Sequence, residues 1–149
     1  MEFMETNTQT NNQKEKGEEK EMTIEEIARK NFVLWKEALL TGDAKAVAEL
    51  YAKDNTFLPT MSGDFKKGVE AAAGYFEHFL LINPNGEVVE EAIQSMGDKY
   101  YSHNGMYNFE VDENGNRVIK ECRFTYNWRK EDDGKWRIIH HHSSVKPQS

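Results

Sequence analysis

The sequence predicts an α+β fold in which three helices precede an antiparallel meander of four strands. Two observations support this prediction. Apolar residues recur three or four positions apart between residues 24 and 80, whereas apolar and polar residues alternate after residue 86. Glycine-containing turns then divide the second half of the chain into four segments, and strands joined by tight turns run antiparallel. A block of helices followed by a block of strands indicates helices packed on one face of a sheet.

The first predicted helix follows a capping box, in which Thr23 and Glu26 can satisfy each other's backbone N–H groups. Its apolar positions recur at helical spacing as far as Leu39, and Gly42 marks its end. Asp43 caps a second, shorter helix. We expect an apolar face on that helix, formed by Ala46, Val47, Leu50 and Tyr51.

A short strand and a third helix complete the first half of the chain. The segment Thr56–Pro59 is typical of an edge strand, because proline lacks the N–H that a central strand donates. The third helix begins at Gly68 and ends before the Asn-Pro-Asn-Gly turn at residues 83–86.

Four strand-length segments follow. In the third, the even-numbered positions of 122–128 are apolar or aromatic and the odd-numbered ones are polar, so we expect the even face to contact the helices. The last segment has no clean polar face: Trp136 and Ile138 lie on one face, and Ile139 and His141 lie on the other. A strand that is apolar on both faces suggests that a second copy of the chain covers the outer side. The four segments are residues 88–96, 99–111, 117–129 and 135–145.

Composition excludes several classes of function. The chain has 149 residues, a formal net charge of -7 and a pI near 5.3. The negative field repels phosphate, so we expect no nucleic-acid partner, and no apolar stretch approaches the roughly 18 residues of a membrane span. A single cysteine, Cys122, cannot form an internal disulfide, which suits a cytoplasmic protein. Residues 1–22 are almost entirely polar, and we expect them to be a disordered tail before one domain at 23–149.

Three consecutive histidines, His140 to His142, are the most conspicuous candidates for chemistry. On a strand they alternate between faces, so at most two can share a metal, and no motif supplies the other ligands of a zinc site. We therefore expect no metal and no cofactor. The sequence also lacks nucleotide-binding glycine loops and nucleophile elbows. His141 is a candidate acid/base if it points inward beside Tyr126.

Several short motifs occur in a recognisable order. They are Gly42-Asp43, Thr56-Phe57-x-Pro59, Tyr75-Phe76-Glu77, Thr125-x-x-Trp128 and Asp133-Gly134-Lys135-Trp136-x-x-x-His140-x-His142-x-Ser144. With these motifs, nearly all of residues 23–147 resembles the association (hub) domain of calcium/calmodulin-dependent protein kinase II, of the nuclear transport factor 2-like superfamily. The ending is also similar to stand-alone SnoaL-like proteins. The resemblance implies a cone-shaped fold, a curved sheet wrapped on a long helix, and assembly into homodimers or rings of dimers.

The resemblance also indicates where a ligand and a partner would bind. At the positions that match the cationic pocket residues of the kinase domain, this chain has Ala73, Tyr126 and Ser143, which implies a small neutral or aromatic ligand. Trp35 and Tyr51 would form the apolar wall of that pocket. The residues expected at the interface between copies are Arg123, Thr125, Trp136, Ile138, His140 and His142.

Two functions stay open. The first is a stand-alone hub-like domain whose main property is homo-oligomerisation, with an open cone pocket for a small ligand. The alternative is an isomerase- or cyclase-type enzyme in that pocket, with Tyr126 as hydrogen-bond donor and His141 as general acid/base. A carrier without catalysis is a third hypothesis. We favour assembly over catalysis, because no inward-facing strand position is expected to carry a carboxylate base.

Overall fold

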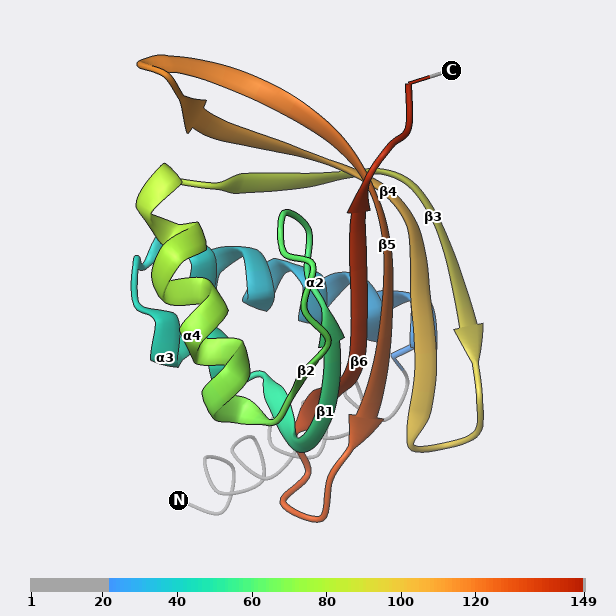
Figure 1. Cartoon of the computed structure of the whole chain (residues 1–149). Helices are drawn as coiled ribbons and strands as arrows, with labels where there is room; N and C mark the ends of the chain where they lie inside the picture. Colours follow the sequence, from blue (N-terminus) through green and yellow to red (C-terminus); the bar gives the residue numbers. More distant parts are fainter. Residues whose placement is uncertain (1–21, 149) are drawn as a thin grey trace, which may run out of the picture.

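The computed structural model describes residues 22–148, in which three α-helices pack against one curved sheet of six strands (Figure 1). The predicted α+β class is confirmed. Apart from Met22, the predicted polar tail at residues 1–22 lies outside the described residues. None of the helices described over residues 22–148 is long and apolar enough to cross a membrane.

Helices α2 (Ile24–Leu40) and α4 (Val69–Phe79) supply the helical side of the core. The Thr23 hydroxyl accepts a hydrogen bond from the Glu26 backbone N–H at 3.1 Å, as the capping box predicts. A 3₁₀ turn, η1 (Leu80–Ile82), continues α4. The buried residues of α2 are Ala28, Asn31, Phe32, Trp35, Ala38 and Leu39.

The second helix is shorter than predicted. Helix α3 spans Ala44–Ala48, with Asp43 as its N-cap. Leu50 and Tyr51, which we expected on its apolar face, lie beyond its end, and Tyr51 begins strand β1. The Leu50 carbonyl accepts a hydrogen bond at 2.8 Å from the backbone N–H of Ile138. Pairing with a strand distant in the sequence therefore outweighs local helical spacing at this point.

The sheet has six strands in the order β2-β1-β6-β5-β4-β3, one more than the predicted edge strand and four-stranded meander together. The strand predicted at Thr56–Pro59 lies in β1 (Tyr51–Leu58), and the strand that was not predicted is β2 (Lys66–Lys67). Strand β1 pairs in parallel with β6 and antiparallel with β2, so it is not the edge strand that Pro59 suggested. Pro59 follows the last residue of β1 and needs no ladder hydrogen bond. The predicted antiparallel meander is formed by β3 (Asn85–Ser95), β4 (Tyr100–Glu113), β5 (Asn116–Lys130) and β6 (Trp136–Val145).

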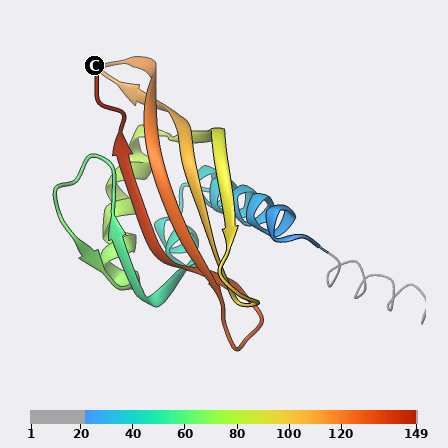
Figure 2. The same cartoon turned by 90° about the vertical axis from the view of Figure 1, so that its right-hand side faces the viewer.

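Aromatic side chains fill the space between the sheet and the helices. Figure 2 shows the strands side by side in front, with the helices behind them. The even-numbered positions of residues 122–128, in β5, face this core, as predicted, and each is at most 4% exposed. The largest fully buried side chains include Trp35, Trp128, Tyr51, Tyr101, Tyr107 and Tyr126.

A β-bulge in β6 reverses which of its residues face the helices. Ile139 is an extra residue between two cross-strand pairs, Ile138 with Trp128 and His140 with Asn127. Inward positions are even-numbered before the bulge and odd-numbered after it. The expectation that Ile138 lies on the outer face is therefore wrong, and its side chain is 0% exposed within one chain.

The bulge also explains why the last strand looked apolar on both faces. Trp136 precedes the bulge and packs inward, with its ring centroid 5.0 Å from that of Tyr101. His141 and Ser143 follow the bulge and are buried as well. The apolar residues of β6 thus belong to a single inner face. The alternation pattern of β6 no longer argues for a second copy covering the sheet.

A second bulge lies in β3. Val89 is the extra residue between the pairs that Val88 and Glu90 form with β4. The change in alternation turns Glu91 inward, towards α2. Opposite the bulge, Gly105 has a φ of 153°, and a Cβ there would collide with the Glu90 carbonyl. Only glycine fits this position without a shift of the backbone.

Candidate functional site

His141 lies at the centre of the cone. Its side chain reaches inward from β6, is 2% exposed, and stacks on Tyr126 with the ring centroids 4.0 Å apart. Phe57 of β1 stacks on the imidazole of His141, with the ring centroids 4.9 Å apart. Trp35 of α2 meets the imidazole edge-on, at a centroid distance of 5.8 Å. Contacts from two strands and one helix hold the imidazole in one orientation. His141 therefore points inward beside Tyr126, which is the position expected of it for an acid/base role.

Both ring nitrogens of His141 have hydroxyl partners. Nδ1 lies 2.8 Å from the Tyr51 hydroxyl, and Nε2 lies 3.2 Å from the Tyr107 hydroxyl. The Tyr51 oxygen also accepts a hydrogen bond from Trp35 Nε1 at 3.1 Å, and an indole N–H can only donate. The arrangement that leaves no buried proton unpaired has Tyr51 donating to Nδ1. Neutral His141 therefore carries its proton on Nε2 and donates it to Tyr107.

The hydrogen bonds continue from Tyr107 to a loop. The Tyr107 hydroxyl donates to Ser143 Oγ at 2.5 Å, and Ser143 in turn forms a hydrogen bond with the hydroxyl of Thr60. Thr60 is a buried residue in the loop that follows β1. Donation thus runs in one direction from Trp35 in α2 as far as Ser143, and either hydroxyl of the Ser143–Thr60 pair can be the donor. We call this series the hydroxyl relay. Its members are Trp35, Tyr51, His141, Tyr107, Ser143 and Thr60.

Burial keeps the hydroxyl relay neutral. It holds the pKa of His141 well below the ordinary value of 6.5, and the charges of His140 and His142 act in the same direction. Burial also raises the pKa of the Tyr51 and Tyr107 hydroxyls well above 10. At neutral pH His141 is therefore a fixed donor at Nε2 and acceptor at Nδ1, and it is not a cation.

A cavity of about 20 Å³ lies beside the Thr60 end of the relay. That volume holds roughly one water molecule, so this cavity is narrower than the open pocket that we expected. Its lining is almost entirely apolar. Among the expected pocket residues, those that line the cavity are Trp35, His141 and Ser143. Those that do not are Tyr51, Tyr126 and Ala73.

A second buried imidazole, His103 of β4, sits against a carboxylate. Its Nε2 lies 2.7 Å from one oxygen of Glu91, whose other oxygen accepts a hydrogen bond from Arg29 Nε at 2.7 Å. Burial lowers the pKa of His103, and the hydrogen bond to Glu91 offsets part of this effect. Burial raises the pKa of Glu91, but the hydrogen bonds from Arg29 and His103 outweigh it, and the net pKa is below the ordinary value.

Several of these residues were not predicted from the sequence. No inward-facing carboxylate was expected on a strand, and the bulge in β3 supplies one in Glu91. This carboxylate is held by His103 and does not line the cavity, so it is no free base in the cone. The apolar alternation of β4 could have placed His103 and Tyr107 inward. No local signal marks Thr60, which reaches the relay through a loop.

The outer face of the sheet has an uncharged centre. Strand pairing aligns two adjacent rows of five residues, which we call the central rows. One row is Thr56, His140, Asn127, Ser102 and Gln94, and the next is Leu58, His142, Thr125, Asn104 and Ala92. None of the ten is Asp, Glu, Lys or Arg, although these make up 30% of the chain.

The expected interface residues separate into two groups. Thr125, His140 and His142 belong to the central rows, and Arg123 lies in the adjoining row, opposite Ser144. Trp136 and Ile138 face the core instead, because of the bulge in β6. Among residues 22–148, no group of three or more His, Cys, Asp or Glu side chains is placed to hold a metal ion.

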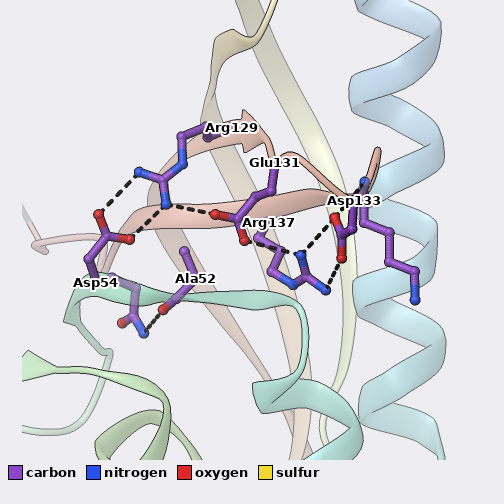
Figure 3. A network of polar contacts seen from close by, with 8 residues as sticks. Ala52, Asp54, Arg129, Glu131, Asp133 and Arg137 are labelled. Atoms are coloured by element: carbon purple, nitrogen blue, oxygen red, sulfur yellow. Dashed lines mark hydrogen bonds and ion pairs between the residues drawn. The ribbon is translucent and has the colours of Figure 1, made fainter.

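A network of ion pairs closes one end of the outer face. Figure 3 shows Arg129 between Asp54 and Glu131, and Arg137 between Glu131 and Asp133. The N–O distances in this order are 2.8, 2.8, 3.1 and 2.9 Å. The hydrogen bond from Arg129 lowers the pKa of Asp54. Each charge of this network has an opposite partner, so the charges at this end of the face are paired.

The fold defines the class of this protein, a cone-shaped α+β protein of the NTF2-like type. A solved NTF2-like protein with a cystatin-like fold, from Novosphingobium aromaticivorans, superposes with a TM-score of 0.69. Its sequence is 14% identical, and the match covers 85% of this chain and 84% of that chain. At this identity the likeness shows the fold alone.

The sequence defines a narrower group. A model of the calcium/calmodulin-dependent protein kinase II association domain matches residues 24–147, and the chain belongs to that family. A structure from Xanthomonas campestris, assigned to the same association domain, is 36% identical with a TM-score of 0.80. That match covers 83% of this chain and 89% of the other. No curated protein matches the sequence significantly. The resemblance inferred from the motifs is confirmed.

Proposed function

We propose that this protein is a homo-oligomerisation domain that pairs through the outer face of its sheet. The observation that carries the proposal is the pair of central rows, ten neighbouring side chains without a carboxylate, lysine or arginine. Protein interfaces are depleted of charged residues at their core. The reason is that removing an ion from water costs several kcal/mol more than removing a neutral polar group. Membership of an association-domain family supports the same function.

The flanks of the outer face support the same orientation. The ion-pair network at Asp54 and Arg129 lies at one end, and Arg123 in the adjoining row donates to Ser144 Oγ at 3.2 to 3.3 Å. An uncharged centre with charges at its rim is the usual anatomy of an interface. A two-fold contact would bring the same rows of both copies together.

The buried thiol of Cys122 fits the reducing cytoplasm, which we propose as the compartment.

The substitution Asn127→Arg tests this proposal. Asn127 lies in the middle of the first central row, and its partners across the strands are His140 and Ser102. A guanidinium there would be desolvated in both copies, so we expect association to weaken by at least about 100-fold. Sedimentation velocity at micromolar concentration measures this change.

The matched control is Asn116→Arg, on the same strand but exposed in the β4–β5 turn, outside the central rows. We expect this variant to assemble as the parent does. A parent that is monomeric at micromolar concentration would refute the proposal, as would equal assembly of the two variants.

A second candidate function is small-ligand binding, with or without catalysis, at the Thr60 end of the hydroxyl relay. The relay favours it, because it presents an oriented hydroxyl beside an apolar cavity. The volume of about 20 Å³ argues against it, since a ligand larger than water would need Met61 or other lining side chains to move. Neutral His141 could still serve as donor and acceptor within the relay in such a reaction. Assembly requires no such rearrangement.

A further inference from the structure

We infer that assembly through the outer face is controlled by pH, with His140 and His142 as the titrating groups. This inference rests on the proposed function, because it needs the central rows to be buried between copies. Each central row contains one of the two histidines, and they are the only side chains of the ten that can become charged near neutral pH.

The two histidines lie side by side at the centre of the face. They are two positions apart on β6 after the bulge, so both point outward. His140 is half-buried within one chain, and its Nδ1 lies 2.7 Å from the Thr56 hydroxyl. His142 is exposed. A partner covering the central rows would therefore remove more water from both imidazoles.

No carboxylate faces these imidazoles in the central rows. Their neighbours are Thr56 and Leu58 on β1 and Thr125 and Asn127 on β5, all uncharged. A proton bound to either histidine would therefore lack an anionic partner once the face is covered.

The charges in the same row and in the adjoining row act in the same direction. Lys67 of β2 extends the first row beyond Thr56, and Arg123 lies in the row next to His142. The one carboxylate in that adjoining row is Glu90, at the far strand β3. On the other side, the ion-pair network holds three carboxylates and two arginines, and an arginine engages each of the carboxylates. The charges that adjoin the two histidines in these rows, Lys67 and Arg123, are thus positive.

Symmetry doubles this effect. A two-fold contact between identical faces holds four of these histidines, two from each copy. Burial lowers the pKa of His140 even in a single chain, and the charge of His142 lowers it further. A partner covering the face would strengthen both causes of the lowered pKa. The imidazoles would lose water, and the partner would bring two further imidazoles close to them.

The sign of the effect follows from proton linkage. If the pKa of these histidines is lower in the assembly than in the free chain, free chains bind more protons as the pH falls below about 6.5. Acidification then favours free chains. Each affected histidine weakens association by up to about tenfold per pH unit. We expect the apparent dissociation constant to rise at least about tenfold between about pH 7.5 and 6.

The experiment measures the dissociation constant by sedimentation over this pH range, with a chelator present to exclude bound metal. The parent, the double variant His140→Gln/His142→Gln and the control His78→Gln are compared. His78 is exposed on α4, outside the sheet. We expect the double variant to lose most of the pH dependence of its dissociation constant, while the control keeps the dependence of the parent. Circular dichroism at each pH separates dissociation from unfolding.

The outcomes distinguish this inference from the proposed function. A parent that assembles equally at both pH values overturns the inference and leaves the oligomerisation proposal standing. A parent that is monomeric at pH 7.5 refutes both. The inference also fails if the double variant keeps the full pH dependence, or if it no longer assembles at pH 7.5, because neutral histidines would then be needed for the contact itself.

Discussion

The two buried imidazoles of this protein, His141 and His103, are almost equally hidden but have opposite surroundings. They are 2% and 0% exposed. The partners of His141 are the neutral hydroxyls of Tyr51 and Tyr107, whereas the partner of His103 is the Glu91 carboxylate. The comparison teaches that burial alone does not fix the charge of an imidazole. The chemistry of the group at hydrogen-bond distance decides how far burial can lower the pKa.

The difference also concerns stability. Removing His141 takes one of two hydrogen-bond partners from each of two buried hydroxyls, since Tyr51 keeps Trp35 and Tyr107 keeps Ser143. Removing His103 leaves Glu91 still paired with Arg29, and the carboxylate is partly exposed, with 22% of its side chain accessible. The Nδ1 atom of His103 is already buried without a hydrogen-bond partner among the described residues. The hydroxyl relay is therefore the more tightly determined of the two regions.

The largest effect is expected from replacing each imidazole by a ring without nitrogen. His141→Phe keeps an aromatic ring against Tyr126 but takes one hydrogen bond from each of the buried hydroxyls of Tyr51 and Tyr107, and a buried polar group left short of a partner costs about 1 to 3 kcal/mol. We expect the free energy of unfolding to fall by about 3 kcal/mol. His103→Phe orphans no fully buried group, so we expect about half that loss. Urea denaturation at one fixed protein concentration measures both, and equal losses would show that the two sites are not different in this respect.

The pH dependence of stability is the second way to separate the two sites. Both histidines have a pKa lower in the native chain than the ordinary 6.5, so the unfolded chain binds more protons as the pH falls through that value. Stability is therefore lost on acidification, by up to about 1.4 kcal/mol per pH unit for each histidine. The lowered pKa of Glu91 matters only at lower pH. Its contribution to the free energy of unfolding is lost as the pH falls below 4.5, the ordinary pKa of a glutamate.

Proton NMR of the imidazoles sharpens this prediction. We expect His103 to titrate at a higher pH than His141, because the carboxylate of Glu91 offsets part of the effect of burial. Replacing Glu91 by glutamine removes that offset and should lower the pKa of His103 without moving that of His141. The proposed difference between the two sites is contradicted if His141 of the parent titrates at a higher pH than His103.

The smallest effect concerns two neighbouring tyrosines. The Tyr107 hydroxyl contacts His141 and Ser143, whereas the Tyr126 hydroxyl is buried without a hydrogen-bond partner among the described residues. Tyr107→Phe should lower the free energy of unfolding by about 1 to 2 kcal/mol. Tyr126→Phe should leave it unchanged or raise it slightly. If the two substitutions cost the same in thermal or urea denaturation, the hydroxyl relay does not contribute as described.

Local patterns in the sequence were enough for much of the fold. The Thr23 capping box is present, and Gly97, Gly115 and Gly134 have positive φ in the turns between the predicted strands. The alternation of residues 122–128 placed Tyr126 inward correctly. These features depend on neighbours within a few positions, which is why a single sequence reveals them.

Features that depend on distant partners were not predictable in the same way. Tyr51 fits the helical spacing of the residues before it, but its place is in a strand that pairs in parallel with β6. Its hydrogen bond to His141 joins positions 90 residues apart. The faces of the expected interface residues were predicted only in part for a related reason, since Thr125 and His142 face outward and Ile138 does not.

The sequence by itself determined the three helices, the four strands of the meander, the turns between those strands and the family. Only the tertiary structure decided which face each histidine occupies and what it contacts. The physical reason is the pair of bulges at Val89 and Ile139. A bulge is defined by the register with the neighbouring strand, and one extra residue moves every later side chain of that strand to the opposite face. These two shifts turned Glu91 and His141 into the core and left His140 and His142 together on the outer face.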